Sequence, residues 1–251
     1  MGKILELKNV SLSYYTKNDE ILALDNLNFK CNKGDFLSII GPSGCGKTTI
    51  LSLIAGLIKP TKGYVEIENV DNSNKNKTFG YMLQKDYLFP WRTIEKNIFL
   101  PLEIKKDKSK ESREYAYGLL EKYGLKDFIK NYPDQLSGGM RQRAALIRTL
   151  VCKPEILLLD EPFSALDSQT RLSVCDDVYK IIKQEQKTSI LVTHDIAEAI
   201  TMSDIILVLS SRPAQVKSVH IPNLVGDSPI KKRESNNFSV LFEKIWSELN
   251  L

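Results

Sequence analysis

Four short apolar runs restrict the fold of this chain more than any other feature of its sequence. They are Phe36–Ile40, Ile156–Asp160, Ser189–Thr193 and Asp204–Leu209. Each run is too short for a typical helix, and none alternates like a strand that has one face in water. We therefore expect strands that are covered on both faces. Because helical stretches separate them, the sequence predicts an α/β fold with a largely parallel sheet.

Other segments predict additions to this sheet. Lys3–Tyr15 alternates loosely and predicts an antiparallel strand beside the core. Between Lys85 and Cys152, strand-like runs give way to charged helical segments such as Glu111–Tyr123, which predicts a helical insertion. The expected division is a single domain, with residues 1–84 and 153–210 as its core, 85–152 as its helical part and 211–251 as a C-terminal extension.

Smaller segments complete the prediction. Lys47–Leu57 predicts a helix that ends before Pro60. The tail contains a strand-like piece, Gln215–Ile221, and an amphipathic helix, Phe238–Leu249. The polar segment Asp71–Lys77 predicts an exposed loop.

Composition excludes several classes of protein. The 251 residues are 42% hydrophobic and 26% charged, which is ordinary for a globular domain and excludes a disordered or low-complexity chain. A net charge of +4 is too small to predict nucleic-acid binding. The apolar runs are far shorter than the roughly 18–20 residues of a membrane-spanning helix. The first residues also lack a signal-peptide core, so we expect a cytoplasmic protein.

The cysteines support the same compartment. Cys31, Cys45, Cys152 and Cys175 lie far apart in the sequence, and the chain has only two histidines. This spacing favours neither a zinc site nor a disulfide framework. We expect reduced thiols, as is usual in a cytoplasm.

A glycine-rich segment, Gly41–Thr48, joins the first apolar run to the predicted helix. It fits the pattern G-x-x-x-x-G-K-[ST], in which backbone N–H groups converge on one hollow and the helix N-terminus adds positive charge. Lys47 would reach the β- and γ-phosphates of a nucleotide, and the Thr48 hydroxyl would hold Mg²⁺. A chance glycine-rich turn is the alternative. The residues assigned to the nucleotide here are Gly41, Pro42, Ser43, Gly44, Cys45, Gly46, Lys47, Thr48 and Thr49.

Two acidic residues, Asp160 and Glu161, end the second apolar run. The carboxyl ends of strands are where open α/β sheets bind ligands. Asp160 can hold Mg²⁺ there, and Glu161 is placed to activate an attacking water. Both acids could instead cap the next helix, but a phosphate loop earlier in the same chain favours the catalytic interpretation.

A third motif, Leu136–Gln142, reads LSGGMRQ and lies upstream of the two acids. Together the three motifs resemble the ATP-binding cassette family, the ATPase subunits of transporters. The resemblance extends from Lys3 to about Leu209 and includes Ser164–Asp167, a segment that shapes the subunit interface in this family. It implies a P-loop NTPase core of the RecA-like type, with a parallel sheet, an antiparallel β edge and a helical subdomain. It also implies hydrolysis of ATP with Mg²⁺.

The resemblance implies roles for further residues. Gln84 corresponds to a glutamine that senses Mg²⁺ or the attacking water, and His194 to a histidine that contacts the γ-phosphate and orients the water. Ser137 is a good N-cap. In this family its hydroxyl and the N–H groups of Gly138 and Gly139 face the γ-phosphate of ATP on a second subunit, so that two chains enclose two nucleotides.

An aromatic residue near the end of the first strand would stack on adenine. Tyr14 is our assignment and Tyr15 is the alternative, because the segment around Tyr15–Glu20 is longer than is usual in the family. Alternatively, either residue is an ordinary tyrosine of the strand.

Two weaker segments, Leu88–Thr93 and Ser211–Pro213, resemble the nitrate/sulfonate/taurine group of importer ATPases, which includes importers of thiamine-precursor pyrimidines. This implies a homodimer at the cytoplasmic face of the cell membrane, with separate integral-membrane permease subunits, an extracytoplasmic substrate-binding protein and no nucleic acid. The alternatives are a soluble cassette protein of translation or DNA maintenance, an iron–sulfur assembly ATPase and, more remotely, a phosphotransferase.

Overall fold

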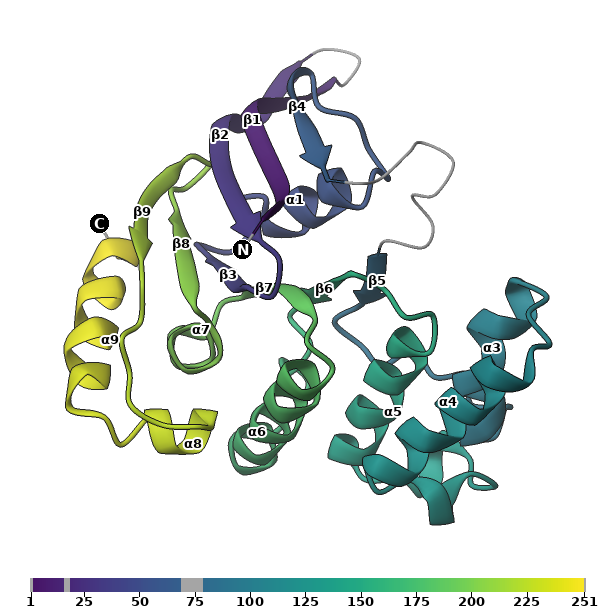
Figure 1. The fold of residues 1–251 in the computed structure, drawn as a ribbon. Helices are drawn as coiled ribbons and strands as arrows, with labels where there is room; N and C mark the ends of the chain where they lie inside the picture. The colour runs from purple at the N-terminus through teal and green to yellow at the C-terminus, as the bar shows by residue number, and fades with distance from the viewer. Residues whose placement is uncertain (1, 16–18, 69–78, 251) are drawn as a thin grey trace. The chain divides into compact units, whose positions relative to one another are not determined.

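The computed structural model describes residues 2–15, 19–68 and 79–250 (Figure 1). The predicted loop Asp71–Lys77 lies outside the described residues. The chain divides into two compact units, Met1–Lys75 with Lys187–Leu251, and Asn76–Gln186. We call them the first unit and the second unit and describe each by itself. The predicted domain boundaries stay a prediction.

The parallel strands of the first unit form around β3 (Phe36–Ile40). It pairs in parallel with β7 (Thr188–Thr193) and with β8 (Ile205–Leu209), so that Ile40 lies opposite Thr193. Every residue of β3 and β7 is buried, which explains why neither strand alternates. β9 (Val216–His220) adds an antiparallel edge to β8. The predicted parallel strands and the tail strand are therefore confirmed.

A separate antiparallel sheet in the first unit contains β1 (Lys3–Tyr15), β2 (Glu20–Asn32) and β4 (Lys62–Ile67), with β1 in the middle. The predicted strand at the start of the chain is confirmed with the same boundaries. Its pairing with β2 shifts register between Leu7 and Val10, and Asn9 there has a φ of 49°. These irregularities explain why the alternation of this segment is loose.

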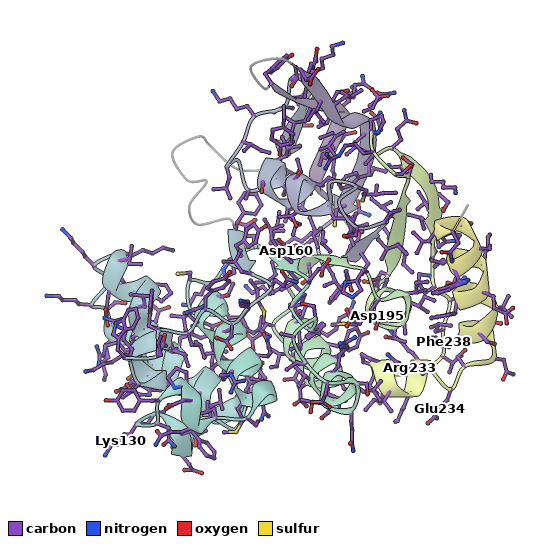
Figure 2. The ribbon with its side chains drawn as sticks, turned by 180° about the vertical axis from the view of Figure 1, so that it is seen from behind. Lys130, Asp160, Asp195, Arg233, Glu234 and Phe238 are labelled. Atoms are coloured by element: carbon purple, nitrogen blue, oxygen red, sulfur yellow. The ribbon has the colours of Figure 1, made fainter. Side chains whose placement is uncertain are left out.

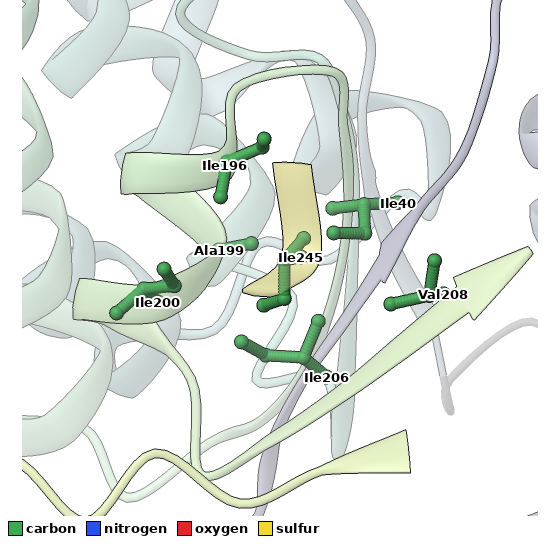
Figure 3. Close-up of a cluster of buried hydrophobic side chains, with 7 residues drawn as sticks. All are labelled: Ile40, Ile196, Ala199, Ile200, Ile206, Val208 and Ile245. Carbon is green, nitrogen blue, oxygen red and sulfur yellow. The ribbon is translucent and has the colours of Figure 1, made fainter. Parts of the chain in front are cut away.

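Helices α1 (Lys47–Ile54) and α9 (Asn236–Leu249) pack at different places in this unit, α1 against β7 and α9 against α7 (Ile196–Met202) and β8. α1 ends three residues before the predicted Leu57, because Gly56 turns the chain with a φ of 72°. α9, which follows the short α8 (Pro229–Lys232), inserts the fully buried Ile245 into an apolar cluster beside α7, as Figure 3 shows. The other members of the cluster are Ile40, Ile196, Ala199, Ile200, Ile206 and Val208. The C-terminal helix thus belongs to the core of the first unit.

The second unit combines two parallel strands with helices. β5 (Phe79–Met82) pairs with β6 (Ile156–Asp160) so that Met82 lies opposite Leu159. Between these strands the chain forms α3 (Ile94–Ile104), α4 (Lys110–Lys122), two 3₁₀ turns (Lys126–Phe128 and Pro133–Gln135) and α5 (Gly138–Leu150), and α6 (Ser168–Gln184) follows β6. The helices expected between Lys85 and Cys152 are confirmed.

The side chains before four of these helices explain where they begin. Each accepts a hydrogen bond from a backbone N–H of the first helical turn, which would otherwise lack a partner. These N-cap residues are Thr93, Ser109, Ser137 and Asp167. α5 packs against both α3 and α6. In the described part of the chain, every helix is too short or too polar to cross a bilayer.

Candidate functional site

The loop between β3 and α1 has a backbone that only glycine adopts readily. Gly44 has a φ of 72° and Gly46 a φ of 122°. Side chains of L-residues are strained in this region of φ, and glycine is not. A Cβ atom added at Gly46 would also lie 2.8 Å from Cδ2 of Leu24 on β2. The glycine spacing therefore reflects a backbone that curls tightly at the end of a buried strand.

Lys47 gives this loop a positive charge. Its side chain is only 6% exposed, and Nζ donates hydrogen bonds to the carbonyl oxygens of Gly41 (2.9 Å) and Pro42 (3.1 Å). α1 begins after Gly46, which has no side chain to cap the first turn. The N–H groups of that turn and the ammonium group therefore face the same loop, an arrangement suited to a phosphate group.

Cys45 lies within the loop but is not set up as a nucleophile. Its side chain is buried, and burial raises the pKa of the thiol, although the nearby charge of Lys47 opposes this shift. The reactive form of cysteine is the thiolate, so Cys45 has a packing role in the loop.

His194 follows β7 at the edge of the sheet where Gly41 follows β3, since Ile40 and Thr193 are paired residues of neighbouring parallel strands. The side chain of His194 is exposed. The turn after it is fixed, because the backbone N–H of Asp195 donates to Oγ1 of Thr193 (3.0 Å). Asp195 in turn caps α7 and is labelled in Figure 2. The structure therefore brings His194 and the glycine loop to one edge.

Tyr14 lies beside α1. Its hydroxyl oxygen is 3.4 Å from Oγ1 of Thr49, and its side chain is 44% exposed. Neighbouring residues of a strand point to opposite faces. Tyr15 accordingly lines a hollow with Ser11 and Ser13, on the other face of β1. Of the two tyrosines considered from the sequence, Tyr14 is the one next to the helix that follows the glycine loop.

In the second unit, Gln84 and Asp160 lie at one edge of the parallel pair. Asp160, labelled in Figure 2, is the last residue of β6. Gln84 comes two residues after β5, whose Met82 is paired with Leu159. Asp160 is 7% exposed, and its Oδ2 accepts a hydrogen bond from the hydroxyl of Tyr81 (3.4 Å). Carboxylate and amide oxygens are ligands that suit Mg²⁺.

Glu161 has a backbone conformation that the sequence does not reveal. Its φ is 46°, which is uncommon for a residue with a side chain. Its carbonyl oxygen accepts hydrogen bonds from the backbone N–H (3.2 Å) and the hydroxyl (3.0 Å) of Ser164. This turn directs the chain sharply away from the strand immediately after Asp160.

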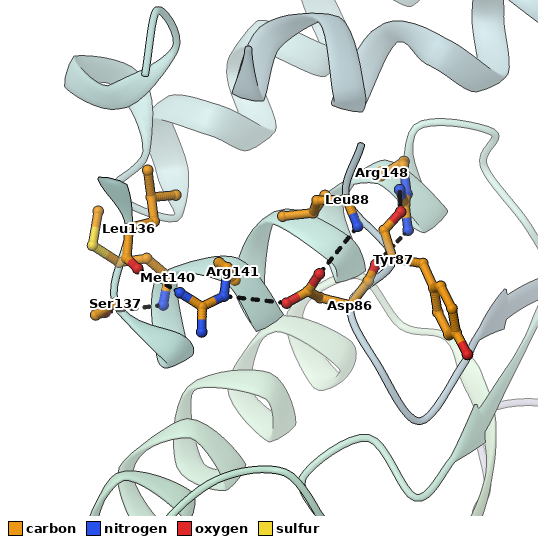
Figure 4. A network of polar contacts seen from close by, with 8 residues as sticks. All are labelled: Asp86, Tyr87, Leu88, Leu136, Ser137, Met140, Arg141 and Arg148. Atoms are coloured by element: carbon orange, nitrogen blue, oxygen red, sulfur yellow. Dashed lines mark hydrogen bonds and ion pairs between the residues drawn. The ribbon is translucent and has the colours of Figure 1, made fainter. Parts of the chain in front are cut away.

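Ser137 begins α5 and is exposed (Figure 4). Its Oγ accepts a hydrogen bond from the backbone N–H of Met140 (3.3 Å), as expected of an N-cap. A Cβ atom on Gly138 would lie 2.9 Å from Cδ2 of Leu166, and one on Gly139 would lie 2.8 Å from Cγ2 of Val174. The two glycines therefore allow the start of α5 to pack closely against its neighbours.

Two arginines of α5 were missed from the sequence. Arg141 donates to Oδ2 of Asp86 (Nε, 3.2 Å) and to the carbonyl of Leu136 (Nη1, 2.7 Å), and Arg148 donates to the carbonyls of Asp86 (2.6 Å) and Tyr87 (2.7 Å). Figure 4 shows that they fasten the segment after Gln84 to the helix that starts at Ser137. Their seven-residue spacing, which places both on one helix face, was the available signal.

The comparisons with known proteins agree with this geometry. The family model of the ABC transporter matches residues 24–164. An uncharacterized ABC transporter ATP-binding protein, YtlC of Bacillus subtilis (strain 168), is 50% identical over 248 residues, which cover 98% of this chain and 95% of the relative. The chain belongs to the ABC transporter family.

Two further similarities extend across most of this ABC protein. The aliphatic sulfonates import ATP-binding protein SsuB of Bacillus anthracis is 39% identical over 96% of this chain and 94% of the relative. The dimeric structure of a post-hydrolysis state of the ATP-binding cassette MJ0796 bound to ADP and Pi has a TM-score of 0.72 and 35% identity, and covers 88% of this chain and 99% of that chain. The predicted fold class is confirmed. The chain is an ABC-type ATPase, and its cofactors are ATP and Mg²⁺.

Proposed function

We propose that this ABC ATPase is a subunit of an importer, in which two copies enclose two MgATP molecules and drive uptake of a small solute through separate integral-membrane permease subunits. It acts at the cytoplasmic face of the cell membrane, and an extracytoplasmic binding protein delivers the solute. The observation that carries the proposal is the similarity to an aliphatic sulfonates import ATP-binding protein over nearly the whole chain. That similarity favours transport over a soluble single-cassette ATPase such as an iron–sulfur assembly factor.

The nucleotide is assigned to the first unit. The backbone of Gly41–Thr49 and the ammonium group of Lys47 hold its phosphates, and the ring of Tyr14 stacks on adenine. Three features support this: the positive φ values of the glycines, the buried position of Lys47, and the contact of Tyr14 with Thr49.

We assign Mg²⁺ to oxygen atoms of Thr48, Gln84 and Asp160. When bound, the ion offsets the negative charge of the phosphate oxygens. The described residues contain no cluster of three or more histidine, cysteine or acidic side chains that could hold a metal. A site that takes part of its ligands from the substrate phosphates, as is usual for Mg²⁺, accounts for this.

Hydrolysis is assigned to Glu161 and His194. The Glu161 carboxylate accepts a proton from water while the water oxygen bonds to the γ-phosphorus and the bond to the ADP oxygen breaks. His194 contacts the γ-phosphate and orients the water. The turn at Glu161 and the hydrogen-bonded turn after His194 support these roles, because both fix the backbone that carries the side chain.

A second copy of the chain supplies Ser137, Gly138 and Gly139 to the same nucleotide. A helix start offers N–H groups and a partial positive charge to an anion. The exposed position of Ser137 supports this role, and so does the dimeric state of the similar cassette MJ0796.

Glu161→Gln tests the catalytic part of the proposal. We expect ATP turnover to fall about 10²- to 10⁴-fold, since the general base is lost, while MgATP still binds and the chain elutes as a dimer. Glu155→Gln is the matched control, because it removes a carboxylate at the opposite end of β6. Near-normal turnover of Glu161→Gln, or failure to form a dimer with MgATP, would reject the role.

Trp91 is our candidate for the contact with the permease. Its side chain is 72% exposed, and its ring lies 5.0 Å from that of Phe89, centroid to centroid. Exposed aromatic side chains often anchor a partner helix in a groove. We expect Trp91→Ala to reduce co-purification with membrane proteins encoded beside its gene, and Trp246→Ala, which alters an exposed tryptophan on α9, to leave it unchanged.

The cargo is proposed from the resemblance of Leu88–Thr93 and Ser211–Pro213 to the nitrate/sulfonate/taurine group. We would reconstitute the chain with its permease and binding protein and add taurine, an alkanesulfonate, nitrate or a thiamine-precursor pyrimidine. One of these solutes should stimulate ATP hydrolysis. Purification without any integral-membrane protein would instead favour the soluble alternative.

A further inference from the structure

The turn between β8 and β9 reaches the glycine loop. Nη2 of Arg212 donates a hydrogen bond to the carbonyl oxygen of Gly44, and the distance is 2.7 Å. Both residues belong to the first unit. The guanidinium group of Arg212 therefore contacts the backbone of the glycine loop directly.

This turn is firmly anchored. The backbone N–H of Ala214 donates to the carbonyl of Ala23 (2.9 Å), and the N–H of Asp25 donates to the carbonyl of Ala214 (3.0 Å). The Gln215 side chain donates to the carboxylate of Asp25 (2.7 Å), and Oγ of Ser210 accepts the N–H of Gln215 (2.9 Å). Arg212 therefore extends from a turn that is fixed to β2.

The same strand contacts the other end of the glycine loop. Leu24 of β2 lies so close to Gly46 that a Cβ atom there would be 2.8 Å from it. By contrast, a Cβ atom on Gly44 would meet nothing within 4 Å among the described residues. Gly46 is held by packing, whereas the Gly44 peptide is held by the hydrogen bond from Arg212.

The orientation of that peptide matters for a phosphate. A peptide group is planar and trans, so its C=O and N–H bonds point in opposite directions. With the Gly44 carbonyl directed to Arg212, the N–H of Cys45 points into the loop, where it donates to the carbonyl of Pro42 (3.3 Å). The guanidinium group of Arg212, outside the loop, thus fixes the direction of the Cys45 N–H inside the loop. It also adds positive charge beside the loop.

We propose that Arg212 is a positioning residue for nucleotide binding, which holds the Gly44–Cys45 peptide in the conformation that receives phosphate. The inference rests on the proposed role of Gly41–Thr48. Without Arg212 the competent loop conformation is less populated, and the apparent affinity falls by the same factor. Because the contact is exposed, we expect a rise in the Kd for nucleotide of about three- to tenfold.

Calorimetry on the full chain tests the proposal with MgATP and MgADP. Arg212→Ala should raise both Kd values about three- to tenfold, and Arg212→Lys should recover part of the loss. KM for ATP should rise with little change in kcat, because binding alone is affected. Lys217→Ala is the control, since Lys217 on β9 donates to the carbonyl of Glu248 and not to the loop. Equal Kd values for Arg212→Ala and the unmodified chain overturn the inference.

Thiol labelling supplies a readout besides activity. Cys45 is 1% exposed and Cys31 is fully buried, so neither should be alkylated readily in the folded chain. Alkylation of Cys45, followed by peptide mass spectrometry, reports opening of the loop, and alkylation of Cys31 reports general unfolding. We expect Arg212→Ala to speed labelling of Cys45 and leave Cys31 unchanged. Faster labelling of both Cys45 and Cys31 that Arg212→Lys does not reverse would mean that the variant unfolds, and it would reject a positioning role.

Lys47→Ala, measured in parallel, tests the phosphate site separately from the role of Arg212. If it leaves nucleotide affinity unchanged, the proposed phosphate site itself is wrong. If it weakens binding while Arg212→Ala does not, only the role of Arg212 is wrong.

Discussion

Two helix starts in this chain are suited to an anion, and they are built differently. α1 follows a loop with Lys47 buried inside it, whereas α5 follows Ser137, whose hydroxyl already accepts the N–H of Met140. The nearby cation of α5, Arg141, is engaged by Asp86 and the Leu136 carbonyl. The first start therefore has a charge and a curled backbone of its own, and the second has only neutral donors.

The glycines of the two regions also serve different needs. Gly44 has a positive φ and open space around its Cβ position, so the backbone conformation alone requires glycine there. Gly138 and Gly139 are helical residues that leave space for Leu166 and Val174. Glycine is therefore required for two different reasons, backbone conformation in the loop and lack of space in α5, and mutations can separate the two.

The largest effect is expected for Lys47→Ala. It removes the charge of the first helix start, and a hydrogen bond to a charged group contributes about 1.5–3 kcal/mol, so the affinity for MgATP should fall about 10- to 150-fold. Isothermal titration calorimetry measures this directly. If Ser137→Ala weakened binding by a single chain as strongly, the contrast between the two helix starts would be lost.

Ser137→Ala should act on turnover and not on binding by the single chain. We expect ATP hydrolysis to fall about tenfold at protein concentrations that form the dimer, since one donor to phosphate is lost. The lost N-cap should also lower the free energy of unfolding by about 1 kcal/mol. Ser109→Ala is the matched control, because Ser109 caps α4 in the same way, and this variant should lose stability and keep its activity.

Gly139→Ala tests whether lack of space requires glycine at the start of α5. The added methyl group would meet Val174, and we expect a loss of about 1 kcal/mol in the free energy of unfolding, measured in urea. Val174→Ala should restore part of it in the double variant. Gly44→Ala should lose a similar amount through its φ, and no neighbouring truncation should rescue it. If truncation of a neighbour rescued both Gly139→Ala and Gly44→Ala, or neither, the distinction between lack of space and backbone conformation would be wrong.

The smallest effect is expected in the stability of the chain at acidic pH. Burial opposes ionisation of Glu185 at the end of α6, but hydrogen bonds from Lys122 (2.7 Å) and Tyr123 (2.7 Å) outweigh it and lower the pKa of this carboxyl. The stabilisation is complete above the ordinary glutamate pKa of about 4.3 and is lost as pH falls through the lower pKa of the folded chain. Glu185→Gln should therefore flatten the acid side of the stability profile in urea unfolding. An unchanged slope would mean that Glu185 contributes nothing there.

Local patterns were enough to predict much of the fold. The apolar runs around Phe36–Ile40 and Ile156–Asp160 predicted the buried parallel strands, because residues covered on both faces must be apolar along their whole length. The spacing of Gly41, Gly46 and Lys47 predicted the loop, and the φ of 122° at Gly46 is one that few other residues adopt. Both signals lie within a few neighbouring residues.

The features that were missed depend on residues far apart in the sequence. Arg141 meets Asp86 across 55 positions, and Arg212 meets Gly44 across 168. No periodicity reports such a pair. The contact that supports Tyr14 over Tyr15, the one with Thr49, also joins residues far apart in the sequence. The positive φ of Glu161 is set by its turn, and the roles assigned to these residues stay predictions until tested.

The discontinuity of the first unit has a consequence for synthesis on the ribosome. β3 leaves the exit tunnel long before its partners β7 and β8, because residues 76–186 are translated between them. The second unit is continuous and can fold as it emerges. The strand that carries the phosphate loop must stay unpaired until Thr188 and the residues after it have been made. The earliest motif to be synthesised is therefore among the last to reach its native form.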